Sequence, residues 1–241
     1  MPFHDRADAG RRLARALGHV VPERPVVLAL PRGGVPVAAE IAQALHAPLD
    51  LVIARKIGTP MQPEVAMGAV VDGTTPIILR NEDIIRYARV SENDFRVIAN
   101  AEIAEIERRR GRYLAGRATV DVHDRVVILV DDGIATGATV RAAIRAVRRR
   151  HPARLILALP VGPTAIVEQL RRDVDELVCL EVHDRFTSVG GFFVDFRPTS
   201  DEEVVAALAR CPADVDEIGT PTQRDGVAAS PHAVTGGPGR H

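Results

Sequence analysis

The sequence lacks tryptophan, has two cysteines, and contains only 3% aromatic residues among its 241 positions. Cys179 and Cys211 form neither a metal-ligand pattern nor a disulfide framework. No apolar run approaches the roughly 20 residues that a membrane-spanning helix needs. The N-terminus is polar and charged where a signal peptide would carry its apolar segment. We therefore expect a soluble, cytoplasmic protein that makes no contact with a membrane.

Several motifs of well-known enzyme classes are also missing. The sequence has no G-x-x-x-x-G-K-[ST] and no G-x-G-x-x-G, which removes the main support for a P-loop or Rossmann nucleotide site. It has no G-x-S-x-G and only four serines, which argues against a serine hydrolase. No H-E-x-x-H or Cys/His cluster indicates zinc. The formal net charge of −1 gives no overall positive field, so we expect no nucleic-acid partner.

The dominant pattern is an alternation of short apolar runs with segments of helical spacing. Val37, Ile41 and Leu45 share one helical face, and Pro163 suits a first helical position before Ile166. The apolar runs are nearly continuous, as in strands buried on both faces of a parallel sheet. We predict an α/β fold with an open, mainly parallel sheet and helices on both faces. The predicted strands cover residues 26–30, 49–54, 77–79, 126–130, 155–161 and 177–182.

Two segments depart from this alternation. Residues 91–117 predict one long inserted helix, with Ser91 as its N-cap and Asp94 at the capping-box position. Its arginine run is interleaved with glutamates, including the i, i+4 pair Glu105–Arg109, which favours a solvated face over a nucleic-acid surface. From residue 212 the pattern dissolves into Pro, Gly, Thr and Ala. We predict one domain over residues 1–211 and a disordered tail or linker over 212–241.

The most informative stretch is VVILVDDGIATGAT, residues 126–139. A buried strand ends in Asp131 and Asp132, at the edge where open α/β sheets bind ligands. A loop of small residues then enters a helix, whose first N–H groups suit a phosphate. A ribose diol or a hydrated Mg²⁺ suits the two carboxylates. The plainer alternative is that both aspartates begin a loop and a threonine caps the helix.

The whole stretch resembles the phosphoribosyl pyrophosphate (PRPP) signature of type I phosphoribosyltransferases. The resemblance implies that Asp131 and Asp132 hold the ribose hydroxyls, with a catalytic role, and contact Mg²⁺ through water. It also implies a type I phosphoribosyltransferase-like fold with a small hood segment over the site. The 5′-phosphate would be bound by the loop residues Ala135, Thr136, Gly137, Ala138 and Thr139.

Two further loops fit this resemblance. In LPRGGVPV, residues 30–37, the glycines make a tight turn and Pro36 starts a helix, but neither explains Arg32 at the sheet edge. The equivalent family loop binds pyrophosphate and often holds a non-proline cis peptide, which implies that role for Arg32 and Gly33. In ARKIGTPMQPEVAMG, residues 54–68, Gly and Pro predict a mobile loop. The resemblance implies a lid whose Arg55 and Lys56 contact the departing pyrophosphate; a solvated connection is the alternative.

The segment FTSVGGFFVDFR, residues 186–197, holds four of the six phenylalanines. It stands where relatives build the hood, so it is either an aromatic lid or a satellite hydrophobic cluster, and no pattern in it specifies a base. The resemblance implies Mg²⁺-dependent transfer of the phosphoribosyl group of PRPP to a small nitrogenous base. The alternative is a non-catalytic regulatory protein that binds PRPP or a nucleotide. We expect a homodimer or higher homo-oligomer.

Overall fold

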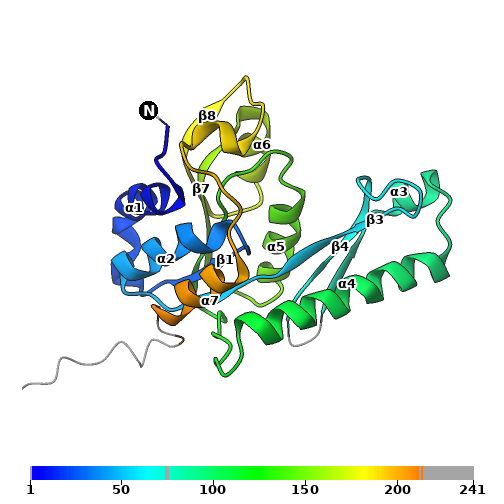
Figure 1. The fold of residues 1–241 in the computed structure, drawn as a ribbon, viewed down its shortest axis with the longest axis horizontal. Helices are drawn as coiled ribbons and strands as arrows, with labels where there is room; N and C mark the ends of the chain where they lie inside the picture. Colours follow the sequence, from blue (N-terminus) through cyan, green and yellow to red (C-terminus); the bar gives the residue numbers. More distant parts are fainter. Residues whose placement is uncertain (1, 74–75, 212, 214–241) are drawn as a thin grey trace, which may run out of the picture.

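The computed structural model describes residues 2–73, 76–211 and 213. Its centre is a five-stranded, fully parallel sheet in the order β2-β1-β6-β7-β8 (Figure 1). All five residues of β6 are buried, as the continuous apolar run predicts. The predicted sheet, with the 126–130 strand in its interior, is therefore confirmed. The strands are β1 (Val26–Ala29), β2 (Leu49–Leu51), β6 (Val126–Val130), β7 (Arg154–Pro163) and β8 (Glu176–His183).

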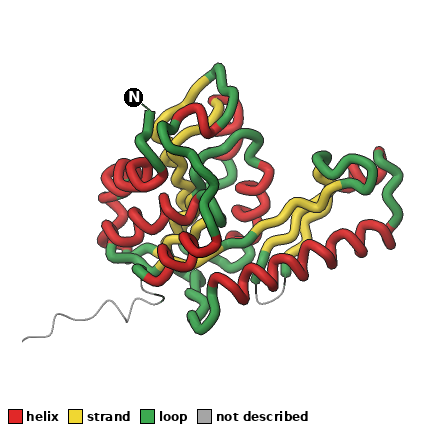
Figure 2. Tube along the Cα trace, viewed as in Figure 1, coloured by secondary structure: helices red, strands yellow, loops and turns green. Residues whose placement is uncertain are grey.

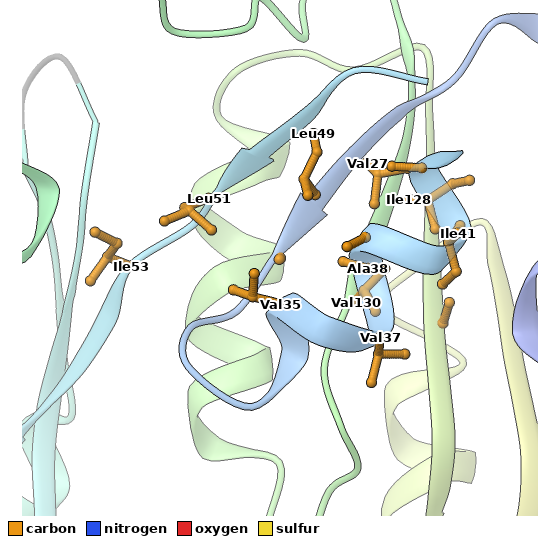
Figure 3. Packing of buried hydrophobic residues seen from close by; sticks show 14 of the residues in the cluster. Val27, Val35, Val37, Ala38, Ile41, Leu49, Leu51, Ile53, Ile128 and Val130 are labelled. Carbon is orange, nitrogen blue, oxygen red and sulfur yellow. The ribbon is translucent and has the colours of Figure 1, made fainter. Parts of the chain in front are cut away.

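Helices cover both faces of this sheet. Val27, Ile128 and Val130 face Ile41 and its neighbours on one side, as Figure 3 shows. Val26, Val127 and Leu129 point to the other side, because successive side chains of a strand alternate between faces. The first face is covered by α1 (Arg6–Ala16), α2 (Gly34–Leu45) and α7 (Asp201–Ala209), and the second by α5 (Ala138–Arg148) and α6 (Thr164–Leu170).

A second unit, which we call the arm, projects from this body (Figure 2). It is an antiparallel sheet in the order β3-β4-β5, joined to two helices. Its longest helix begins after Ser91, whose Oγ accepts from the Asp94 backbone N–H at 3.1 Å. The predicted helix and its cap are thus confirmed, although the helix ends at Tyr113. The arm contains β3 (Ala54–Gly58), β4 (Ala66–Val71), β5 (Ile77–Arg80), α3 (Glu82–Tyr87) and α4 (Glu92–Tyr113).

Four sequence expectations are wrong, three of them in this region and one in the body. The single strand predicted over 49–54 is two strands of different sheets, because β2 ends at Leu51 and the chain joins the other sheet as β3 from Ala54. The strand predicted over 77–79 belongs to the arm rather than to the parallel sheet. The predicted loop over 54–68 is mostly β3 and β4, paired in an antiparallel ladder around the turn at 59–65. Pro163, predicted as a first helical residue, is instead the residue before α6.

Buried polar contacts join the arm to the body. The Asp72 carboxylate accepts from the Ile53 backbone N–H and from Arg110 of α4, both at 2.9 Å. The Asp50 carboxylate accepts from the backbone N–H groups of Leu51 and Val120 at 2.8 and 3.0 Å. These bonds fix where β3 leaves the sheet.

No helix among the described residues is both long and apolar enough to cross a bilayer. The first α-helix is instead amphipathic, with Ala9 and Leu13 buried against the body. The predicted tail over 212–241 lies outside the described residues, apart from residue 213.

Candidate functional site

The carboxylate pair lies where β6 ends. Asp131 and Asp132 are both half-buried, and the Asp132 backbone N–H donates to Asp131 Oδ1 at 2.9 Å. Burial and the neighbouring Asp132 raise the pKa of Asp131 well above its usual range. Burial also raises the pKa of Asp132, against the opposing effect of the Arg6 guanidinium. Both carboxyl groups therefore bind a proton more readily than an exposed aspartate does.

The loop after β1 crosses directly over this pair. A Cβ on Gly33 would collide with the Asp132 carboxylate, and one on Gly34 would lie 2.8 Å from the Val130 carbonyl oxygen. Only glycine fits at these two positions, because the loop lies so close to the Asp132 carboxylate and to the Val130 carbonyl. The peptide bond between Pro31 and Arg32 is cis, the non-proline cis bond that the resemblance implies for this loop. The two predicted loops meet at one edge of the sheet, although they are about 100 positions apart in the sequence.

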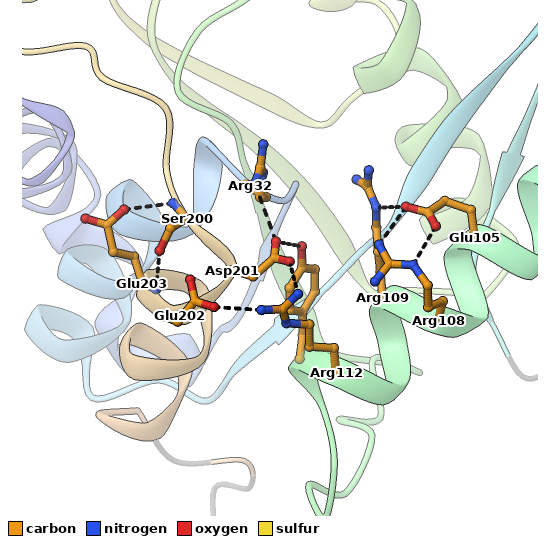
Figure 4. A network of polar contacts seen from close by, with 10 residues as sticks. Arg32, Glu105, Arg108, Arg109, Arg112, Ser200, Asp201, Glu202 and Glu203 are labelled. Carbon is orange, nitrogen blue, oxygen red and sulfur yellow. Dashed lines mark hydrogen bonds and ion pairs between the residues drawn. The ribbon is translucent and has the colours of Figure 1, made fainter.

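The side chain of Arg32 is held at one end of this site by α7. Its Nη1 lies 3.5 Å from Asp201 Oδ1, and 45% of the side chain is exposed. Asp201 also accepts from Tyr113 Oη and pairs with Arg112, both at 2.6 Å (Figure 4). Burial and the Asp201 bond raise the pKa of Tyr113 to about 12, so its hydroxyl stays a donor. The positive charge of Arg32 is therefore partly neutralised by Asp201 of α7.

The loop from Gly133 into α5 offers free backbone donors. Gly133 and Gly137 have φ of 142° and 73°, which favour glycine. The loop backbone is anchored by Ile134, whose N–H donates to the Val161 carbonyl at 3.1 Å. No side chain caps α5, and within the described part of the chain the N–H groups of residues 135–139 donate no hydrogen bond. Such a helix start is suited to an anion.

Arg55 and Lys56 stand on β3 rather than on a mobile loop. Arg55 Nε donates to Glu102 of α4, and Lys56 Nζ donates to Glu64 at 2.8 Å. Both residues line a groove of about 230 Å³ between β3 and α5, whose other wall includes Ala138 and Thr139. The structure therefore brings these two cations and the N-terminus of α5 to one groove.

Sequence reasoning missed Arg6, which donates from Nε to Asp132 Oδ2 at 2.7 Å. The two residues lie 126 positions apart, and the only sequence signal at Arg6 is that of an ordinary first helical residue after the cap Asp5.

The hood segment packs partly as a hydrophobic cluster. Phe193 is buried against Phe3 with ring centroids 5.2 Å apart, and Phe186 stacks on Phe192 at 5.3 Å. Phe186, Phe192 and Phe196 remain only partly buried around this cluster. The satellite cluster is therefore observed, and the aromatic lid stays a prediction for the partly buried rings.

The fold and this sheet edge together define a doubly wound α/β protein, a class whose ligands bind at the carboxyl ends of the strands. Comparison with known proteins gives the family. The model of the phosphoribosyl transferase domain matches residues 6–197. The chain therefore belongs to the phosphoribosyltransferase family, type I, as the PRPP-type motif predicts.

The similarity to individual proteins is consistent with this family. Two strains of Mycobacterium tuberculosis have a protein named "Putative phosphoribosyl transferase" that is 42% identical over 217 residues. The match covers 90% of this chain and 48% of the relative, so the chain spans about half the length of these relatives. A crystal structure of a Thermus thermophilus protein is similar with a TM-score of 0.75 and 40% identity, covering 86% of this chain and 98% of that one.

Proposed function

We propose that the chain transfers the 5-phosphoribosyl group of PRPP to a nitrogenous base and releases pyrophosphate. The observation that carries this proposal is the open N-terminus of α5 at residues 135–139, which follows the half-buried carboxylate pair in the chain. Ala135, Thr136, Gly137, Ala138 and Thr139 bind the 5′-phosphate, mainly through backbone N–H groups. Asp131 and Asp132 accept hydrogen bonds from the ribose hydroxyls. Fixing both ends of the sugar orients its C1 for attack.

The cationic residues act on the leaving group. Gly33 permits pyrophosphate to approach the backbone of the loop after β1, and Arg32 neutralises its charge. Arg55 and Lys56 reach it from the groove between β3 and α5. All three cations are paired with carboxylates, Asp201, Glu102 and Glu64, which must release them when the more highly charged pyrophosphate binds. The base attacks C1 while the carbon–oxygen bond to pyrophosphate breaks, and the pyrophosphate carries away the electron pair.

Members of this family generally use Mg²⁺. Asp131 and Asp132 offer the carboxylate oxygens that this ion prefers. Among the residues that the structure describes, no group of three or more His, Cys, Asp and Glu side chains could hold a metal. Asp131 and Asp132 would be the residues that hold the ion, which gives up its waters reluctantly. When bound, the ion supplies Lewis-acid stabilisation of the leaving group.

A second candidate is a regulatory protein that binds PRPP or a nucleotide without turnover. It is favoured by the ordered β3, because a paired strand with neutralised cations is a fixed binding wall rather than a mobile lid. A panel assay separates the two functions: PRPP, Mg²⁺ and one candidate base at a time, followed by detection of pyrophosphate and new nucleotide. Turnover with any base supports the transferase, and PRPP binding with no product from the panel supports the regulator.

A further inference from the structure

Arg6 is the first residue of α1, and three contacts hold its guanidinium. Nε donates to Asp132 Oδ2 at 2.7 Å, and Nη1 donates to the Arg197 carbonyl at 2.8 Å. Its Cζ lies 3.9 Å from the centroid of the Phe196 ring. Only 11% of the side chain is exposed. The planar fork of arginine can bond and stack at the same time, so all three contacts are compatible.

Two of these contacts come from the hood, which is itself joined to the N-terminal segment. The Phe3 N–H donates to the Phe192 carbonyl at 2.8 Å, and the Val194 N–H donates to the Phe3 carbonyl at 2.9 Å. The Asp195 N–H donates to the His4 carbonyl at 2.8 Å. The start of the chain and the hood thus form one packed unit, and Arg6 connects this unit to the carboxylate pair.

Arg6 is also the counter-charge of that pair. Among the described residues, it is the only cation that hydrogen-bonds to either Asp131 or Asp132. Arg32 pairs instead with Asp201, and Arg197 pairs with Asp195 and Glu203. Removing Arg6 would leave two adjacent carboxylates without a bonded cation.

We infer that Arg6 is a positioning residue of the sugar site, which fixes the Asp132 carboxylate for a hydroxyl of a phosphorylated pentose and connects that contact to the hood. This inference rests on the proposed function. Because the guanidinium is buried and held on three sides, it is part of the wall of the site rather than a gate that the sugar displaces. The sugar therefore binds Asp132 while Arg6 stays in place.

The test compares two probes, ribose 5-phosphate and inorganic phosphate, by calorimetry in a buffer with EDTA. Arg6→Met keeps an apolar stem against Phe196 but removes the bond to Asp132. We expect ribose 5-phosphate to bind about 10- to 100-fold more weakly, and inorganic phosphate to change by less than about twofold. Arg6→Lys should restore part of the loss. The matched control is Arg12→Met on the same helix, which removes an ion pair with Asp8 and a contact with the Phe3 ring but should change neither affinity.

A double-mutant cycle tests the route of the effect. In an Asp132→Ala background, Arg6→Met should weaken ribose 5-phosphate binding by less than about twofold further. Tighter binding by Arg6→Met, equal weakening of both probes, or full additivity with Asp132→Ala would each overturn the inference. The proposed function fails separately, if the parent does not prefer ribose 5-phosphate to phosphate or if Asp132→Ala changes nothing. An effect of Asp132→Ala with none of Arg6→Met defeats only the role of Arg6.

Discussion

The parallel sheet and the arm contribute to the same groove in different ways. β6 is buried throughout and ends at the carboxylate pair, whereas β3 is only partly buried and carries its cations along its length. The edge of a buried sheet holds donors and acceptors at fixed positions. The arm contributes Arg55 and Lys56. The positions of these two side chains relative to the sheet depend on how the arm is joined to the body. The sheet edge thus supplies polar groups at fixed positions, and the arm places two cations beside them.

The arm's cations also differ from each other in how tightly they are held. The Arg55–Glu102 pair is about a quarter exposed, with side-chain exposures of 31% and 21%. In the Lys56–Glu64 pair, the glutamate is 95% exposed. Exposed ion pairs contribute little to stability because water and salt screen them, so Lys56 can be released at little cost. Lys56 is therefore the arm residue best placed to move onto a ligand.

The largest effect is expected from a charge placed at the start of α5. Ala138→Asp puts a carboxylate beside the N–H groups of the phosphate loop, where it competes with and repels a bound phosphate. We expect ribose 5-phosphate affinity to fall by more than about 100-fold. Ala138→Asn has nearly the same shape without charge and should lose far less. Equal affinities for the two variants in calorimetry would place the phosphate elsewhere on the molecule.

The next largest effect concerns the joint between arm and body. Burial raises the pKa of Asp72 from 3.8 to about 6, against the opposing backbone bond from Ile53 and the charge of Arg110. Between these two pH values the folded protein binds more protons at this group than the unfolded chain does. The contribution of Asp72 to stability therefore falls as pH rises from about 4 to about 6, by up to about 3 kcal/mol.

Denaturant unfolding at several pH values measures this contribution. Asp72→Asn keeps an acceptor for Ile53 and Arg110 but no longer titrates, so it should lose less stability than the parent over that range. Asp121→Asn is the control, because the pKa of Asp121 is lowered by the His123 backbone N–H and its linkage has the opposite sign. A parent and an Asp72→Asn variant with parallel pH profiles would show that the joint does not titrate there.

The carboxylate pair should have an effect of intermediate size. Asp131→Asn and Asp132→Asn keep the shape of each side chain but remove its charge, which weakens the bonds accepted from the sugar hydroxyls. Each change should weaken PRPP binding by about 10- to 100-fold, since charge-assisted hydrogen bonds contribute about 1.5–3 kcal/mol. Asp173→Asn, a surface carboxylate 3.7 Å from Arg141, serves as the control. If both site variants bind PRPP like the parent, the carboxylates do not hold the sugar.

The body of the molecule could be predicted because its sequence signals are local and agree with each other. The run at 126–130 is apolar at every position, as a strand covered on both faces requires. The small residues at 133–139 follow at once, so strand, turn and helix start are all read from one stretch. Gly33 was likewise visible as a turn glycine. The sequence does not show that Gly33, which has no Cβ, makes room for the Asp132 carboxylate. That contact joins two segments that lie far apart in the chain.

The sequence does not predict the sheet of the arm because its strands are short and interrupted. Residues 54–68 contain two glycines and two prolines, and their apolar positions do not alternate cleanly. These segments form strands because β4 pairs with β5 and α4 packs against the sheet. Local propensity predicts neither contact. Arg6 was missed for a different reason. One arginine among many on an amphipathic helix has no distinguishing local pattern, and the contacts of Arg6 with Asp132 and with the hood join segments that lie far apart in the sequence.

The smallest effect is expected at Lys56, which is the only lysine in the sequence. In a transferase this cation stabilises pyrophosphate as it departs, so its contribution arises mainly in the transition state. Lys56→Ala should then lower kcat about tenfold or more, with little change in PRPP affinity. In a regulator the same lysine would hold intact PRPP, and Lys56→Ala would weaken binding with no rate to lose. Glu64→Gln is the matched control, because it frees the lysine without removing it.

Two measurements on the parent and both variants separate these outcomes: PRPP affinity by calorimetry, and turnover by release of pyrophosphate. The single lysine allows an independent measurement, since an amine-selective reagent can modify only Lys56 and the chain's N-terminal amine. PRPP should protect Lys56 weakly if the lysine acts in the transition state, and strongly if it holds the ground-state ligand. A large affinity loss in Lys56→Ala, strong protection of the parent and no turnover with any base would together defeat the transferase. The arm would then be a binding wall for PRPP, and the sheet edge and the arm would both serve recognition alone.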